Sequence, residues 1–206
     1  MIIIEFLHKY FLEYILKNSI AIFALVFSIY QFIKGYNINS GAYLLELRNV
    51  FLEEKKNTLH LELRNKSNYA PEDWAVVDDY LGTFEVVYIM IKRGALNKSN
   101  IKELYSYRVS NIVRNQEIFE KKLVLEYKSW GNFYQLISKF DGKRWNKFYE
   151  FLHKIETTQE INFSNYCSVS DLLKNLDADI RNEFEIELRK LERHEIGQRL
   201  TNNLSV

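Results

Sequence analysis

Cysteine, proline and glycine are scarce in this sequence of 206 residues, and each shortage excludes a class of protein. A single cysteine, Cys167, rules out an intramolecular disulfide framework and a multi-cysteine zinc module. One proline, Pro71, and seven glycines are too few for the many turns of an all-β fold, so long helices are expected. Charge of one sign is not in excess either. The balance of 28 Lys and Arg against 27 Asp and Glu excludes a strongly basic nucleic-acid binder or an acidic tail as the dominant character.

The best-defined motifs of catalysis are also missing. The chain contains no GxxxxGK[ST] or GxGxxG loop for phosphates, no HExxH or HxxxH spacing for a metal, and no GxSxG elbow for a nucleophile. The four histidines, at positions 8, 60, 153 and 194, are scattered. We therefore predict no cofactor and no metal site.

Apolar side chains are abundant, at 47% of the chain, and they are concentrated near the N-terminus. The 16 residues from 18 to 33 carry no charge, which corresponds to about 24 Å of helix against the roughly 30 Å of bilayer hydrocarbon. Lys17 and Lys34 can extend to the headgroups and so lengthen the span. We predict a retained, single membrane helix in residues 1–35. The alternatives are a cleaved signal peptide, which would need a short basic start and a small-residue cleavage site, and a buried core helix.

One face of this N-terminal segment is small and polar. Glu5, Lys9, Glu13 and Lys17 recur at every fourth position with alternating sign, and small or polar residues continue the same face. Such a face is typical of helix packing in an assembly, and in a ring of subunits it could line a pore. Simple anchoring of the helix is the third interpretation. The predicted pore or helix-packing face comprises Glu13, Lys17, Ala21, Ala24, Ser28 and Gln31.

Residues 36–206 show helical periodicity throughout, and no linker divides them. Helix boundaries are predicted at Pro71, at Arg93 and Gly94, near Gly131, and at Asp141 and Gly142. One helix is expected from Ser40 to about Arg64, and another through Phe119 and Trp130. The predicted fold is all-α, with one transmembrane helix followed by a cytoplasmic bundle of five to seven helices.

Three features of this bundle are candidates for chemistry. A basic segment carries Lys139, Lys143, Arg144 and Lys147, which could contact phosphates or lipid headgroups, although its aromatic residues fit a core stripe better. Glu85 lies in an apolar stretch, where a hydrogen-bonded structural role is favoured over ligand binding. Arg189 and His194 form an RxxxxH spacing on a segment rich in lysine and glutamate, which is also the pattern of a solvated, ion-paired helix face.

The chain resembles two groups of proteins. Trp74, Tyr80, Leu81, Phe84, Glu85 and Gly94 match the W..v..YL..FE.......k.G.l segment of a bacterial domain family of unknown function with one N-terminal membrane helix. The architecture is also similar to the membrane accessory proteins of type VI-B CRISPR systems, which have a divergent HEPN-like helical domain (higher eukaryote and prokaryote nucleotide-binding). In HEPN ribonucleases RxxxxH is the catalytic signature, and the resemblance identifies Arg189 and His194 as its trace here.

These resemblances imply a HEPN-like bundle on a bacterial inner-membrane protein with its large domain in the cytoplasm. They imply an oligomeric pore, or a membrane-perturbing effector in antiviral, CRISPR-associated defence. The expected partners are membrane lipid, further copies of the chain, and an RNA-guided effector protein or RNA. The alternatives are a membrane-tethered HEPN-type ribonuclease and a non-enzymatic module that recruits a partner to the membrane.

Overall fold

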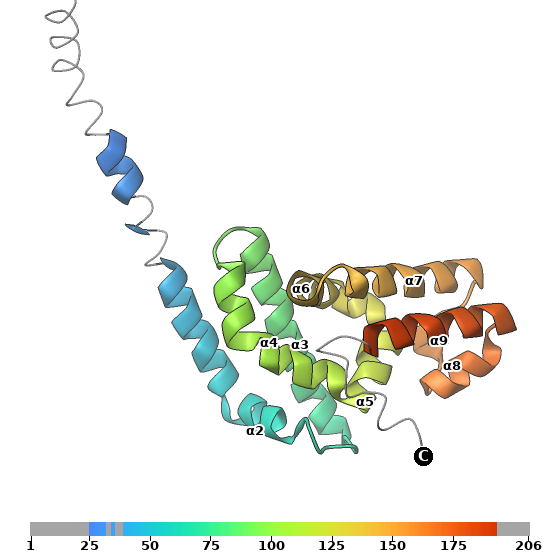
Figure 1. Cartoon of the computed structure of the whole chain (residues 1–206). Coiled ribbons are helices and arrows are strands. Elements are labelled where there is room, and N and C mark those ends of the chain that lie inside the picture. Colours follow the sequence, from blue (N-terminus) through green and yellow to red (C-terminus); the bar gives the residue numbers. More distant parts are fainter. Residues whose placement is uncertain (1–24, 32–33, 36–38, 193–206) are drawn as a thin grey trace, which may run out of the picture. The chain divides into compact units, whose positions relative to one another are not determined.

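The computed structural model of the chain describes residues 25–31, 34–35 and 39–192, and these residues contain helices and no strand (Figure 1). The prediction of an all-α fold is therefore confirmed for this part of the chain. The chain divides into two units, residues 1–45 and 46–206. The division falls ten residues later than the predicted domain boundary between residues 35 and 36.

Within the first unit, residues 25–31 form a helix whose large apolar side chains are exposed. Leu25 is 62% exposed, Val26 59% and Tyr30 57%. Ser28 and Gln31 of the predicted pore or helix-packing face are exposed on the same helix. Glu13, Lys17, Ala21 and Ala24 lie outside the described residues. Among the helices that are described, none has the length and apolar character needed to cross a bilayer.

The second unit begins within the helical residues 39–52 and continues into α2 (Glu54–Glu62). Leu47 and Phe51 are buried before the break at Glu53, and Leu59 and Leu63 are buried after it. The prediction of one helix to Arg64 is wrong at Glu53, where the backbone is extended (ψ 135°). The break at Glu53 separates this helix from α2, which has a buried face of its own.

Helix α3 (Pro71–Lys92) begins and ends where the sequence predicts. Pro71 occupies the first turn, and the Asp73 carboxylate accepts a hydrogen bond from the backbone N–H of Ala70 at 2.9 Å. Gly94 follows the helix with φ +75°, a conformation that glycine adopts without a steric cost. Helix α4 (Lys98–Arg114) begins at Asn97, whose side-chain oxygen accepts from the N–H of Ser99 at 2.7 Å.

The predicted helix through Phe119 and Trp130 is instead three short pieces. They are α5 (Gln116–Ile118), a π-helix η1 (Phe119–Leu125) and a 3₁₀ turn η2 (Tyr127–Trp130). Four consecutive residues, 122 to 125, are at most 6% exposed, a pattern that one face of an α-helix cannot produce. Lys122 among them pairs with Asp78 of α3 and with Glu126, each at 2.7 Å. The wider turn of the π-helix η1 therefore lets consecutive side chains be buried on all sides of this segment.

The remaining helices are α6 (Gly131–Asp141), α7 (Arg144–Thr158), the 3₁₀ turn η3 (Phe163–Asn165), α8 (Val169–Asn175) and α9 (Ala178–Glu192). The predicted interruption at Asp141 and Gly142 is confirmed, since Gly142 has φ +89°. Helices α8 and α9 close the described part of the bundle. Ser168 caps α8, because its hydroxyl accepts from the N–H of Asp171 at 3.0 Å.

Aromatic rings fill the centre of the bundle. Helix α3 packs on α6, α6 packs on α7, and α7 lies beside α9 (Figure 1). The Phe84 ring of α3 lies 4.8 Å from Phe51 and 5.8 Å from Phe133, and all three side chains are at most 1% exposed. The second unit thus has a hydrophobic core of its own. This core holds the helices in place and so positions the polar side chains at their ends.

Candidate functional site: a charge-separated polar cleft

The RxxxxH pair is not assembled by the described residues. Arg189 lies on α9 with its side chain 67% exposed, and its guanidinium pairs with the Glu185 carboxylate at 3.4 Å, one turn earlier. His194 lies outside the described residues. The role of this pair stays a prediction, and the visible half of it has the solvated, ion-paired character that the sequence also allowed.

The basic segment places its aromatic residues in the core. Trp145 and Phe148 are each 1% exposed and Phe140 is 5% exposed, so these rings are not accessible to stacking bases. The core-stripe interpretation is confirmed. Lys143, Arg144 and Lys147 are exposed on the other side, and Lys139 lies over the ring of Tyr88 at 5.8 Å. These four cations remain accessible to phosphates or headgroups.

Glu85 has a structural role. Its carboxylate accepts hydrogen bonds from the backbone N–H groups of Asn132 and Phe133, at 3.0 and 3.3 Å, and so caps the start of α6. Burial raises the pKa of Glu85 although these two hydrogen bonds oppose the shift. The sequence prediction of a hydrogen-bonded carboxylate inside the bundle is confirmed.

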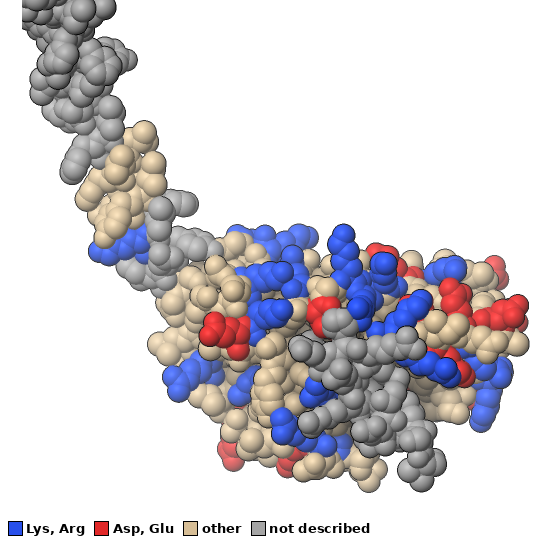
Figure 2. All heavy atoms as spheres, viewed as in Figure 1, with Lys and Arg blue, Asp and Glu red and all other residues tan. Residues whose placement is uncertain are grey.

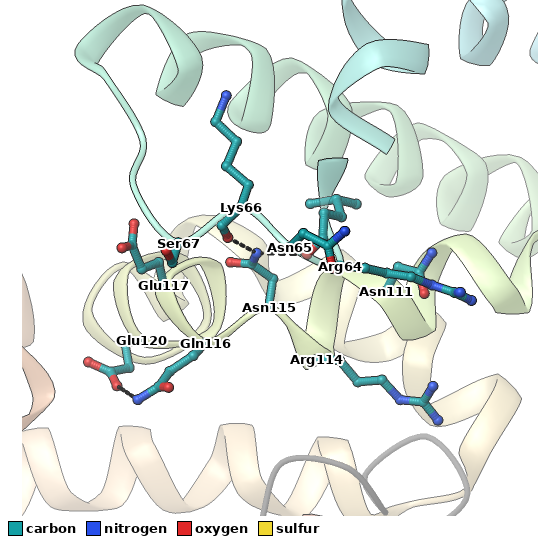
Figure 3. A pocket seen from close by; sticks show the side chains of 11 residues that line it. Arg64, Asn65, Lys66, Ser67, Asn111, Arg114, Asn115, Gln116, Glu117 and Glu120 are labelled. Atoms are coloured by element: carbon teal, nitrogen blue, oxygen red, sulfur yellow. Dashed lines mark hydrogen bonds between the residues drawn. The ribbon is translucent and has the colours of Figure 1, made fainter. Parts of the chain in front are cut away.

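A polar cleft of about 810 Å³ lies between the chain that leaves α2 and the corner where α4 meets α5 (Figure 3). The first wall is residues 63–67 and the second is residues 111–120. We call this site the α2–α4 cleft. Its lining residues are Leu63, Arg64, Asn65, Lys66, Ser67, Asn111, Arg114, Asn115, Gln116, Glu117 and Glu120.

Asn115 joins the two walls. This buried side chain donates from Nδ2 to the carbonyl oxygens of Leu63 and Lys66, both at 2.9 Å. Its Oδ1 accepts from the N–H of Ile118 at 3.1 Å and so caps α5. The Asn115 backbone is extended (φ −78°, ψ 113°), which ends α4 and opens the corner. One asparagine therefore fixes the shape of the cleft.

Asn111 has an unused donor in the cleft. The residue is 3% exposed, and its Nδ2 finds no hydrogen-bond partner among residues 25–31, 34–35 and 39–192. A buried amide N–H without an acceptor is destabilising by about 1–3 kcal/mol, so native structures seldom retain one. Other buried polar atoms in the described residues also have no partner, and Asn111 Nδ2 is the one among them whose residue lines this cleft.

Charge is separated across the cleft. Figure 3 shows Arg64, Asn111 and Arg114 on one side and Glu117 and Glu120 on the other. The lysine of the cleft is already paired: Lys66 Nζ lies 3.0 Å from Asp73 and 3.1 Å from Glu62, and hydrogen bonds to these two carboxylates raise its pKa. Arg64 and Arg114 line the same side of the cleft as Asn111 and give that side its positive charge.

A buried histidine lies behind the basic side. His60 of α2 is 7% exposed, and its Nδ1 lies 3.3 Å from the Tyr80 hydroxyl, which also accepts from Arg108 at 3.2 Å. Burial, with the charges of Arg108 and Arg64, lowers the pKa of His60 to about 4. In the neutral tautomer that carries its proton on Nε2, His60 accepts a hydrogen bond at Nδ1 from the Tyr80 hydroxyl. The Tyr107 ring, 5.4 Å from His60 and 5.1 Å from the Arg64 guanidinium, links this cluster to the cleft.

No group of three His, Cys, Asp or Glu side chains within the described ranges is placed to hold a metal ion. The α2–α4 cleft was not predicted from the sequence. Its signal was weak: Ser110, Asn111 and Asn115 are polar residues in an otherwise apolar helix end, and all three are buried. Comparisons with family models, curated proteins and solved structures give no match to this chain. The function is therefore argued from the residues themselves.

Proposed function

We propose that the chain is a membrane-anchored helical protein that oligomerises through its N-terminal helix and permeabilises or perturbs the membrane. The observation that carries this proposal is the helix at residues 25–31, whose apolar side chains Leu25, Val26 and Tyr30 are more than half exposed. It lies within a run of 16 uncharged residues. Contact with lipid would remove this apolar surface from water, at roughly 25 cal/mol per Å².

The setting of this activity is part of the proposal. We place the bundle in the cytoplasm of a bacterium, at the inner membrane, and the activity in antiviral defence with an RNA-guided effector or RNA as trigger. The support is the architecture, one apolar helix ahead of an all-α bundle with its own core. A membrane-tethered ribonuclease that uses Arg189 and His194 is the alternative enzyme, and recruitment of a partner to the membrane is the alternative without catalysis.

Fractionation and vesicle leakage test this function. The full-length chain should sediment with membranes, resist extraction by high salt and dissolve in detergent, and in vesicles it should release a trapped dye. Full-length chain in the soluble fraction without detergent would remove the membrane proposal. RNA cleavage that stops after His194→Ala would favour the ribonuclease.

Cations gather at one end of the bundle. They lie at the end of α3, the start of α4, the end of α6 and the start of α7, and Figure 2 shows Lys and Arg along this upper edge. Lys139 over the ring of Tyr88, one turn before the end of α3, brings the helix ends together. We call this surface the basic end, and it comprises Lys92, Arg93, Lys98, Lys102, Lys139, Lys143, Arg144 and Lys147. Each such cation near an anionic bilayer adds about 1 kcal/mol of attraction.

The basic end should contact anionic lipid headgroups. A polarity-sensitive dye at Lys143→Cys, in a full-length chain that also carries Cys167→Ser, should shift to a less polar spectrum in vesicles with phosphatidylglycerol. The shift should be lost in purely phosphatidylcholine vesicles and after Lys139→Glu with Lys147→Glu. Lys174→Glu on α8, also exposed, is the matched control and should leave the shift intact. Identical spectra in the two kinds of vesicle would contradict the contact.

A further inference from the structure

We propose that the α2–α4 cleft binds a small zwitterion, with a phosphate at the side of Asn111 and Arg64 and an ammonium group at the side of Glu117 and Glu120. The proposal concerns the bundle alone and does not depend on the membrane function. It rests on three observations: an unused buried donor, a separation of charge, and a cleft of about 810 Å³.

The donor indicates an oxygen ligand. Asn111 Nδ2 is buried and has no acceptor among the described residues, while the neighbouring Asn115 uses both of its polar atoms within the protein. The two asparagines are one helical turn apart, so the same corner holds one amide with a structural role and one without. A ligand oxygen in the cleft would supply the hydrogen-bond acceptor that Asn111 Nδ2 does not find within the described residues.

The positive charge of Arg64 beside Asn111 indicates that the ligand oxygen belongs to an anion. Arg64 projects along the same side as Asn111, with its guanidinium 5.1 Å from the centre of the Tyr107 ring (Figure 3). A ring under the guanidinium restrains its position without using its N–H groups. Arg114 lines the same side. A phosphate, with three terminal oxygens, can accept from an amide and from guanidinium groups at once, whereas a carboxylate offers two oxygens.

The carboxylates on the opposite side of the cleft indicate that the second group of the ligand is positively charged. Glu117 and Glu120 would repel a second phosphate but would attract an ammonium group. Glu120 already accepts from Gln116 at 3.0 Å, which holds it at the edge of the cleft and leaves acceptor capacity on the carboxylate. The volume lies within the roughly 300–1,000 Å³ of small-molecule sites. Phosphoethanolamine is the simplest compound with this distribution of charge.

Binding is measured with full-length protein in a non-ionic detergent. Isothermal titration and thermal unfolding with O-phosphoethanolamine should show saturable binding and a rise in Tm. Inorganic phosphate and ethanolamine, each with half of the ligand's chemistry, should bind about tenfold more weakly or worse. Phosphatidylethanolamine added to the micelles tests the source of the headgroup. Stabilisation by lipid as well as by the free compound would identify a lipid headgroup, and stabilisation by the free compound alone would identify a soluble ligand.

Variants on the two sides give separate tests. Asn111→Leu keeps the branched shape of the side chain, and Arg64→Gln keeps a polar exposed residue. Each should weaken phosphoethanolamine binding about tenfold, an effect on the scale of one charge-assisted hydrogen bond. Glu120→Gln should remove the preference over inorganic phosphate. Arg144→Gln, an exposed arginine at the basic end, is the matched control and should bind like wild type. Absence of saturable binding, or equal binding in Arg64→Gln and Arg144→Gln, would overturn the proposal. Equal affinity for inorganic phosphate and phosphoethanolamine would overturn the zwitterion.

Discussion

Replacing Ser28 with leucine in the full-length chain should reduce dye release from vesicles about tenfold while leaving the protein in the membrane. Ser28 lies on the exposed helix 25–31, on the face that the sequence marks as small and polar. In an assembly such residues face neighbouring helices or a shared lumen, where a leucine would separate the helices or close the opening. Insertion itself should improve slightly, because the leucine is more apolar.

Ala24→Leu and Val26→Leu complete this experiment. Ala24 belongs to the same face in the sequence as Ser28 and should behave like it. Val26, 59% exposed, belongs to the bulky opposite face, so Val26→Leu should release dye like wild type. The size of the oligomer in detergent should change with Ser28→Leu and with Ala24→Leu but not with Val26→Leu. Full activity and an unchanged oligomer in both Ser28→Leu and Ala24→Leu would show that the helix is only an anchor.

The helix boundaries could be predicted because their causes are local. Pro71 fixes a helix start through its own ring, and Gly94 and Gly142 end helices with positive φ angles of 75° and 89°. Asn97 caps α4 through a hydrogen bond to a residue two positions away. In each case the residue that starts or ends the helix lies within one turn of the boundary, so the local sequence is sufficient to predict it.

The π-helix η1 could not be predicted because its cause is tertiary. Its most unusual member is Lys122, which is 4% exposed and pairs with Asp78 of α3, 44 positions earlier. The Trp74 ring lies 5.4 Å from its ammonium group. A lysine in a helical pattern normally indicates the solvent side, and nothing in the periodicity marks Lys122 as buried. The interaction that holds Lys122 inside is invisible in the local sequence.

The α2–α4 cleft was missed for the same reason. Asn115 joins the two walls by donating to the carbonyl oxygens of residues 63 and 66, which are distant in sequence. Asn111 is a candidate ligand contact because its buried Nδ2 has no acceptor among the described residues. Neither asparagine belongs to a recognised motif. The RxxxxH spacing, by contrast, is a motif, yet Arg189 is exposed and paired within its own helix.

Acid should destabilise the bundle between about pH 6.5 and pH 4 through His60. The pKa of His60 is about 4 in the folded protein, against about 6.5 in the unfolded chain. The unfolded state therefore binds more protons in this window, so the stabilisation is fully present above pH 6.5 and is lost as the pH falls towards 4. A difference of this size corresponds to about 3 kcal/mol in the free energy of unfolding. Chemical denaturation of the full-length chain in detergent, repeated across this range, measures it.

His60→Gln isolates the effect from the other acidic transitions. Glutamine stays neutral and retains an acceptor for the Tyr80 hydroxyl, so the variant should lose roughly 1 kcal/mol of ring packing at pH 7 but little more on acidification. Glu156 has a lowered pKa because hydrogen bonds from Lys128, Tyr127 and Phe163 outweigh its burial, so its contribution is lost only at more acidic pH. Burial raises the pKa of Glu85, which acts in the opposite direction and equally in both proteins. The difference between wild type and variant should therefore shrink steadily from pH 6.5 and then reverse in sign. Parallel stability curves would contradict a neutral, buried His60.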